Sequence, residues 1–431
     1  MEVRIKNVGA IESATIRMDG LTVLTGENDT GKSTVLKAIY TIMEPTANLN
    51  RRIRSDIVDT LYSAMDEFEF RIMRGMDKPQ DTVDIKTGTN IGIDKDEIKK
   101  LLSNPMDNNN LLRAARQLQS IQPRDNGYSK TLKIVEDYLS GESGETQFLK
   151  TYFEGIIRSE FSGQIVRFGS DEAYVKMCID SKEFVLSVDN NGIIVNQWEN
   201  VQPKASSVFY IDTPYVVDEL GINLFNPHLS LRSADHRTKL TEQLKHMPEN
   251  NLIDALLADE KMQTINGILG RVLKGHFTTK KNITEYVLDS GLVLNIRNLA
   301  TGLKTFSIVK MLADRGLLGE GTVLAIDEPE VHLHPRWQNM FAELLVLMSK
   351  DLKVRTVITT HSPSFLLAVE AYSAKHRFKV DYYNAKRSDD GSTIQIDEVN
   401  DRLNEAYRHL AEPYLEMDDL LDGADLDADE T

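Results

Sequence analysis

The sequence contains one cysteine, Cys178, among 431 residues. This excludes an internal disulfide and a cysteine-based metal site, and such cysteine usage is typical of proteins from a reducing compartment. No stretch approaches the roughly 18 uninterrupted apolar residues that a membrane-spanning helix requires. The N-terminal segment alternates polar and apolar residues and lacks the layout of a secretion signal. We therefore expect a cytoplasmic protein without a membrane anchor.

Basic residues are fewer than acidic ones, with 50 Lys and Arg against 66 Asp and Glu, which gives a formal net charge of −16. Nine acidic residues lie within 412–431, so removing nine negative charges from −16 leaves −7 for the first 411 residues. This balance excludes a chain whose whole surface binds nucleic acid. Local basic clusters can still mark either a solvated face or a nucleic-acid contact; they are Arg51, Arg52 and Arg54, Arg113 and Arg116, and Lys280 and Lys281.

Hydrophobic periodicity predicts the elements of an α/β protein. Residues 2–8 and 10–18 alternate as an antiparallel strand pair does, and 21–25 predicts a buried strand followed by a glycine turn and a helix at 33–43. Two helical stripes, at 57–68 and 148–161, are followed by a small antiparallel sheet within 163–198. Three short apolar strands follow, and the first is apolar enough for a central position; they are 207–212, 322–326 and 356–360.

These patterns divide the chain into four expected parts. Residues 1–45 and 206–400 form the two portions of one α/β domain, and residues 46–205 form a helical and β insertion lobe between them. Residues 401–431 form a terminal helix and an acidic tail.

A phosphate-binding motif lies between the strand at 21–25 and the helix at 33–43. The pattern is G-x-x-x-x-G-K-[ST], and its residues are Gly26, Glu27, Asn28, Asp29, Thr30, Gly31, Lys32, Ser33 and Thr34. In this pattern, backbone N–H groups and the helix N-terminus bind phosphate oxygens, the lysine reaches the β- and γ-phosphates, and the serine ligates Mg²⁺. The alternative, a glycine turn capped by Ser33, does not explain the order of strand, loop and helix.

Two further strand ends carry polar residues. Asp327 and Glu328 follow the strand at 322–326, and His361 follows the strand at 356–360. In a P-loop ATPase such an aspartate holds Mg²⁺ and the adjacent glutamate can polarise the attacking water. Because parallel strands present their carboxyl ends at one edge of a sheet, we expect His361 to sense the γ-phosphate there; a capping role for His361 is the alternative.

The order of these motifs resembles the ABC-type ATPases of the RecF, SMC and OLD-like group. The resemblance covers approximately residues 1–43 and 283–371, and it includes the signature segment at 298–304. It implies a P-loop ABC-type ATPase head with a mixed β-sheet and a helical plus antiparallel-β insertion. It also implies a head-to-head homodimer, or a higher homo-oligomer, in which Thr301 and Gly302 contact ATP held by the partner's Gly31 and Lys32.

The segments at 300–306, 327–335 and 359–363 resemble ATPases of bacterial anti-phage systems of the Septu, retron-associated and PARIS types. The resemblance implies a separately encoded effector, which in such systems is often a nuclease. Only 70 residues follow His361, which is short for a fused nuclease domain, so we expect the effector to be another chain. Two alternatives stay open. The first is an SMC- or RecF-like ATPase of DNA repair or recombination. The second is a scaffold or sensor that binds ATP tightly, hydrolyses it slowly and is held in its ATP-bound state. A transporter ATPase is disfavoured, because its nucleotide motifs lie closer together than Lys32 and Asp327 do here.

Two secondary hypotheses concern departures from the family pattern. Glu330, His332 and His334 alternate and could hold zinc if the segment were extended, although the same alternation suits a contact between protomers. No glutamine matches the γ-phosphate contact of transporter ATPases, and Asp212 is the residue that we expect at the comparable junction.

Overall fold

The computed structural model describes residues 1–74, 95–103, 106–121, 127–180, 182–189, 191–196, 207–221, 235–245, 260–280, 283–388, 391–413 and 417. The chain divides into two compact units. The helical unit is Asn48–Thr151, and the head unit combines Met1–Ala47 with Tyr152–Thr431. The helical unit is therefore shorter than the insertion lobe that we expected at 46–205. Of residues 414–431, which carry most of the acidic tail, only Met417 is described.

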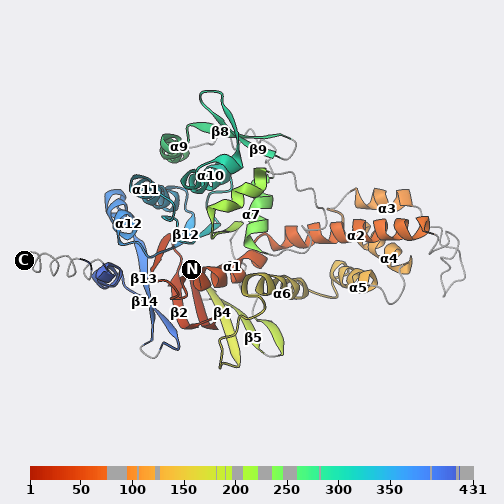
Figure 1. The fold of residues 1–431 in the computed structure, drawn as a ribbon. Helices are drawn as coiled ribbons and strands as arrows, with labels where there is room; N and C mark the ends of the chain where they lie inside the picture. Colours follow the sequence, from red (N-terminus) through yellow and green to blue (C-terminus); the bar gives the residue numbers. More distant parts are fainter. Residues whose placement is uncertain are drawn as a thin grey trace, which may run out of the picture. The chain divides into compact units, whose positions relative to one another are not determined.

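The described part of the head unit contains an eleven-stranded mixed sheet in the order β6-β5-β4-β1-β2-β14-β13-β3-β12-β11-β7 (Figure 1). Its strands are β1 (Glu2–Val8), β2 (Ile11–Arg17), β3 (Leu21–Thr25), β4 (Glu172–Ile179), β5 (Lys182–Asp189), β6 (Gly192–Asn196), β7 (Ser207–Ile211), β11 (Thr322–Ile326), β12 (Arg355–Thr360), β13 (Val380–Arg387) and β14 (Ile394–Glu398). The neighbours β13, β3, β12, β11 and β7 run parallel, so their carboxyl ends share one edge. This mixed sheet confirms the predicted fold class.

Helices cover both faces of the parallel strands. The described helical elements of the head unit include α1 (Lys32–Met43), η1 (Glu44–Thr46), η3 (Pro214–Gly221), α7 (His236–Lys245), α9 (Glu260–Val272), η4 (Ile296–Asn298), α10 (Thr301–Asp314), α11 (Pro335–Asp351) and α12 (Pro363–His376). Alternate strand residues, such as Leu324 and Ile326, join one core with α10, α11 and α12. The intervening buried residues point to the opposite face, on which α1 packs (Figure 1).

The helical unit is built from α2 (Leu49–Met73), α3 (Lys95–Leu102), α4 (Asn108–Ile121) and α5 (Gly127–Leu139). Helix α6 (Thr146–Phe161) begins in this unit and ends in the head unit. Two arginines of the predicted basic clusters have partners here, because Arg54 donates to Asn108 Oδ1 at 2.6 Å and Arg116 to Glu136 Oε1 at 2.9 Å. None of the described helices is long and apolar enough to cross a membrane.

Two predictions about the strands require correction. The strands β4, β5 and β6 do not form a separate sheet, because β4 pairs with β1 and so extends the large sheet. The apolar strand β7 is terminal in the described sheet and is buried because α1 and α7 pack against it. The described residues also form a second antiparallel sheet, which consists of β8 (Gly275–Lys280), β9 (Ile283–Leu288) and β10 (Val293–Asn295).

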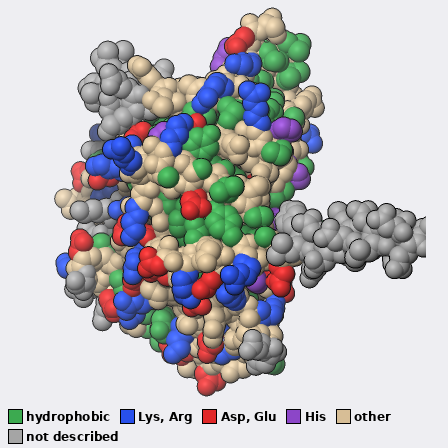
Figure 2. Space-filling model, turned by 90° about the vertical axis from the view of Figure 1, so that its left-hand side faces the viewer, with side chains coloured by type: hydrophobic (Ala, Val, Ile, Leu, Met, Phe, Trp, Pro, Cys, Tyr) green, Lys and Arg blue, Asp and Glu red, His purple; other side chains and the backbone are tan. Residues whose placement is uncertain are grey.

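Figure 2 views the molecule from the side on which α12 lies. Hydrophobic side chains gather near the middle of this face, and Lys and Arg side chains are interspersed with Asp and Glu around them. Helix α12 contributes an exposed apolar residue, Leu367. Among the residues coloured by type, this face is therefore not the basic surface that tracking a nucleic-acid backbone requires.

Candidate functional site

A cavity of about 430 Å³ opens at the carboxyl edge of the parallel strands. Its walls come from three strand ends: residues 28–34 after β3, residues 326–329 at the end of β11, and residues 211–214 at the end of β7. Thr305 of α10, Val331 and His332 complete the lining. The parallel pairing of β3, β12, β11 and β7 is what brings these distant segments together.

The loop before α1 depends on glycine at two positions. Gly26 has a φ of +142° and Gly31 a φ of +74°, both in the region that favours glycine. A Cβ atom on Gly26 would lie 2.5 Å from the carbonyl oxygen of Ala385, so no side chain fits there. Helix α1 begins directly after this loop, at Lys32. Its first N–H groups are therefore directed to the cavity, as anion binding at a helix N-terminus requires.

Lys32 is buried and folded onto its own loop. Its ammonium donates to the carbonyl oxygens of Gly26 at 2.8 Å and Glu27 at 2.6 Å, and it lies 4.0 Å from Glu328 Oε1. Burial lowers the pKa of Lys32, while the nearby carboxylates of Glu328 and Asp327 oppose this shift. Since its closest partners are neutral carbonyls, the lysine gains charge pairing when an anion enters the cavity.

Asp327 is held from two neighbouring strands. Its Oδ1 accepts a hydrogen bond from the Thr359 hydroxyl of β12, and its Oδ2 accepts one from the Tyr210 hydroxyl of β7 at 3.4 Å. The same Thr359 oxygen accepts the backbone N–H of Glu328 at 3.0 Å. One threonine therefore fixes the backbone of Glu328 and the side chain of Asp327 together.

Glu328 faces Lys32 and His361. Its Oε1 lies 3.0 Å from His361 Nδ1 and 4.0 Å from Lys32 Nζ. Its backbone adopts a φ of +45°, which is uncommon for a residue other than glycine and costs about 1–3 kcal/mol. The carboxylate is 30% exposed, so solvent reaches it. This geometry suits a carboxylate that orients a water molecule beside a bound phosphate.

A family model described as an AAA ATPase domain matches residues 1–366. The chain belongs to this ATPase family. Two curated relatives are similar to parts of it. A probable ATPase of retron Vc95 from Vibrio cholerae serotype O1 biovar El Tor is 25% identical over 158 residues, which is 34% of this chain and 30% of the relative. Endonuclease GajA from Bacillus cereus (strain HuB5-5) is 22% identical over 176 residues, or 39% of this chain and 25% of the relative.

The chain thus spans less than a third of the length of these curated relatives. Among solved structures, a Smc head domain with an extended coiled coil, derived from Pyrococcus furiosus, covers 96% of this chain and 98% of its own, with 11% identity and a TM-score of 0.41. The family match confirms the predicted ATPase domain, and the similarity to the retron Vc95 probable ATPase agrees with the predicted resemblance to retron-associated ATPases.

The residues predicted for nucleotide binding fall into two groups in this ATPase domain. Residues 28–34, Asp327 and Glu328 line the cavity together, while Gly26 and Glu27 offer their carbonyls to Lys32. Thr301, Gly302 and His361 are not among the described residues that line it. His361 instead contacts Glu328, and the other two lie at the start of α10.

The two signature residues differ in exposure. Thr301 is partly exposed, and its hydroxyl lies 3.4 Å from that of Tyr215. Gly302 is buried, and a Cβ atom there would lie 3.0 Å from the His332 carbonyl oxygen and 3.2 Å from the Trp337 ring. Glycine at 302 is therefore explained by close packing within the head unit itself.

The zinc hypothesis for Glu330, His332 and His334 is wrong. The segment is not extended, since Val331 N–H donates to the Glu328 carbonyl and Leu333 N–H to the Glu330 carbonyl, which closes two successive turns. Glu330 is buried against Thr360, His332 lies in the cavity wall, and His334 caps α11. No group of three potential metal ligands occurs among the described residues.

Several residues that support the site were not predicted. Tyr210 and Thr359 hold Asp327, and Arg387 of β13 donates to the carbonyl oxygen of Asp29 at 2.7 Å and pairs with its carboxylate at 2.5 Å. Asp212, which we expected at the junction in place of a glutamine, lines the cavity. Thr359 immediately precedes the Thr-His pair in the sequence and could have been noticed there, whereas Arg387 lies on a strand that the periodicity did not indicate.

Proposed function

We propose that this chain binds ATP with Mg²⁺ and hydrolyses it to ADP and phosphate. One observation carries the proposal: the lysine of the phosphate loop and the two carboxylates that follow β11 face one cavity in a chain of the AAA ATPase family. A hydroxyl and a carboxylate are hard oxygen donors of the kind that Mg²⁺ prefers, and Ser33 and Asp327, which both line the cavity, supply them.

Each side chain has a distinct part in this proposal. The first turn of α1 and Lys32 bind the phosphates, and Ser33 and Asp327 hold Mg²⁺, which would neutralise charge on the transferred group. Glu328 accepts the proton of the attacking water, which puts its carboxylate in the role of general base. His361, 3.0 Å from Glu328, orients that carboxylate and senses the γ-phosphate.

The second part of the proposal is that ATP joins the head units of two chains. Thr301 and Gly302 begin α10, whose N-terminus can bind an anion. Thr301 is partly exposed and does not line the cavity of its own chain, which leaves it accessible to ATP held by a second copy.

The dimer is tested with a variant that binds ATP but hydrolyses it slowly. Glu328→Gln with MgATP should double in mass by light scattering, and adding Thr301→Asp should return it to the mass of one chain. An aspartate at the first position of a helix is favourable for folding, so its effect arises from repulsion of the γ-phosphate. Thr146→Asp, the same change at the first, exposed residue of α6, is the matched control. Gly302→Asp is unsuitable, because the packing at Gly302 leaves no room for a side chain.

The proposal would be contradicted if Glu328→Gln stayed at the mass of one chain with saturating MgATP. It would also be contradicted if Thr301→Asp and Thr146→Asp left the ATP-dependent mass equally unchanged.

The third part concerns the effector. We propose that the ATP-bound head pair controls a separately encoded nuclease in anti-phage defence. The support is similarity to a retron-associated probable ATPase and to an endonuclease. Purifying the tagged chain together with the product of the neighbouring gene tests this. We expect a complex with ATP-dependent nuclease activity, whereas DNA-stimulated turnover without any protein partner would favour an SMC- or RecF-like repair function.

A further inference from the structure

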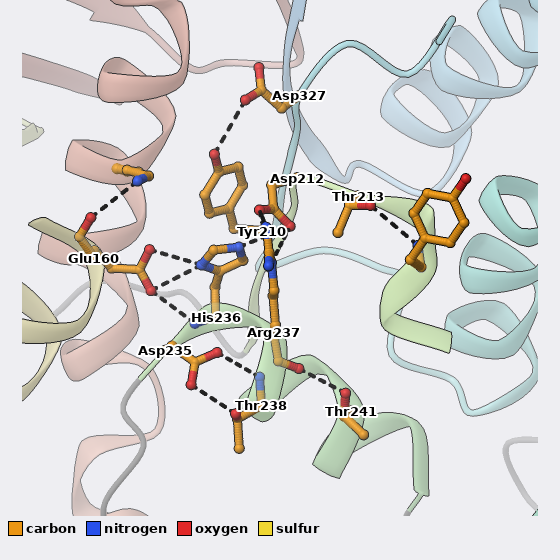
Figure 3. Close-up of polar contacts among 12 residues, drawn as sticks. Glu160, Tyr210, Asp212, Thr213, Asp235, His236, Arg237, Thr238, Thr241 and Asp327 are labelled. Carbon is orange, nitrogen blue, oxygen red and sulfur yellow. Dashed lines mark hydrogen bonds and ion pairs between the residues drawn. The ribbon is translucent and has the colours of Figure 1, made fainter. Parts of the chain in front are cut away.

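A buried histidine lies between two carboxylates behind the ATPase cavity (Figure 3). His236 Nδ1 is 2.8 Å from Glu160 Oε2, and His236 Nε2 is 3.1 Å from Asp212 Oδ1. The backbone N–H of His236 also donates to Glu160 Oε1 at 2.9 Å. Asp235 caps α7 by accepting the N–H of Thr238 at 2.9 Å, which fixes His236 as the first residue of that helix.

Both ring nitrogens of His236 therefore face acceptors, and each can donate only if it carries a proton. The two carboxylates raise the pKa of His236 to about 9 despite its burial, and His236 and Arg237 hold the pKa of Asp212 well below its usual range. Among the described residues, the groups facing the ring are Glu160 of α6, Asp212 and Tyr210 at the end of β7, Tyr40 of α1, and Arg237 beyond Asp212. The two flanking carboxylates and the direction of this pKa shift therefore favour an imidazolium at neutral pH.

The His236 ring supports two residues that line the cavity, Asp212 by direct contact and Asp327 through Tyr210. Asp212, which it binds directly, forms part of the cavity wall. The Tyr210 ring packs on the imidazole with ring centroids 4.3 Å apart, and the Tyr210 hydroxyl donates to Asp327 Oδ2 at 3.4 Å. A single residue, Tyr210, thus connects His236 to Asp327, the carboxylate to which we assign Mg²⁺ binding.

Helix α7 also holds both segments that connect the head unit to the helical unit. The chain leaves the head unit after Ala47, just beyond Glu44, and re-enters it within α6, which carries Glu160. Lys239 of α7 pairs with Glu44 at 2.5 Å, and His236 pairs with Glu160. One helix of the head unit therefore contacts both connections and the cavity wall.

We propose that His236 is a positioning residue of the ATPase site, an imidazolium that holds Asp212 and, through Tyr210, Asp327 in place and ties them to helix α6. This inference rests on the proposed ATPase function. His236 has no contact with Lys32 or the phosphate loop among the polar contacts of the described residues. Its loss should therefore lower kcat and leave KM for ATP nearly unchanged.

Glu160→Gln gives a test that a purely structural role would not satisfy. Removing one of two carboxylates should lower the pKa of His236 toward its ordinary value of 6.5. The ring then carries its charge at about pH 6 and loses it by about pH 8. We expect kcat of Glu160→Gln to be near that of the wild type at about pH 6 and to fall roughly tenfold below it at about pH 8, as small displacements of reacting groups do. Glu154→Gln, an exposed glutamate of the same helix, should follow the wild-type profile.

Histidine NMR provides a readout that does not depend on turnover. In ¹⁵N-histidine spectra, the signal that disappears in His236→Gln should report a doubly protonated ring up to about pH 8 in the wild type and a ring that titrates near neutrality in Glu160→Gln. A neutral His236 in the wild type at pH 7, or parallel kcat profiles for wild type and Glu160→Gln, would overturn the inference. A wild type without any ATP turnover would instead contradict the proposed function, and the NMR result would still decide the state of His236.

Discussion

Glu330 provides a quantitative test of the site's electrostatics. The residue follows Pro329 at the cavity edge and is only 4% exposed. Its Oε1 accepts the Thr360 hydroxyl at 2.5 Å, while its Oε2 has no hydrogen-bond partner among the described residues. Burial raises the pKa of Glu330 to about 7, although the Thr360 hydrogen bond opposes the shift. The folded protein therefore holds a proton on Glu330 at a pH where the unfolded chain has lost it.

The sign and size of the effect follow by linkage. Because the folded pKa of Glu330 is raised from 4.5 to about 7, the free energy of unfolding decreases as pH rises through this window. One pKa unit corresponds to about 1.4 kcal/mol, so the total is about 3 kcal/mol, of which about 2 kcal/mol falls between about pH 5.5 and pH 8. Glu330→Gln cannot ionise and should lack this decrease.

Urea unfolding of wild type and Glu330→Gln at several pH values measures the difference directly, since every other titrating group is common to both chains. We expect the variant to gain about 2 kcal/mol relative to the wild type from about pH 5.5 to pH 8. Glu12→Gln, at an exposed position of β2, should show no such change. A difference between Glu330→Gln and wild type that is independent of pH would refute the reasoning.

Three further outcomes are expected. Lys32→Ala should abolish ATP binding in calorimetry, because it removes the phosphate-loop cation that lines the cavity and would neutralise the phosphates. Gly26→Ala should destabilise the head unit by about 1–3 kcal/mol in thermal unfolding, because a Cβ atom would lie 2.5 Å from the Ala385 carbonyl oxygen at a φ of +142°; an unchanged melting temperature would contradict this. Deleting residues 415–431 should leave steady-state ATP turnover largely intact, since like-charged chain ends commonly face solvent or partners.

The parts of the site that could be predicted from the sequence are those formed by residues that are close together in the chain. The phosphate loop is a run of nine residues, and Asp327 and Glu328 are adjacent after a short apolar strand. Parallel strand ends were expected to converge, and β3, β11 and β12 are neighbours in the sheet. The cavity formed by these strand ends follows from this arrangement.

The supporting residues could not be predicted in the same way. Tyr210 and Thr359 contact Asp327 only because β7 and β12 flank β11, and that order depends on tertiary packing. Likewise, alternation in β4 indicates a half-buried strand but not that its partner is β1, far away in the sequence. The zinc hypothesis failed for a related reason, because it assumed an extended backbone where two turns occur.

The most direct measurement of the central claim compares wild type and Glu328→Gln under the same conditions, with steady-state ATP hydrolysis and ATP affinity determined side by side. The substitution keeps the shape of the side chain that lies 3.0 Å from His361 but removes its charge. If Glu328 is the general base, hydrolysis should fall by about 10²–10⁴-fold while the Kd for ATP stays within a few-fold of wild type. Hydrolysis by Glu328→Gln at the wild-type rate would contradict the account.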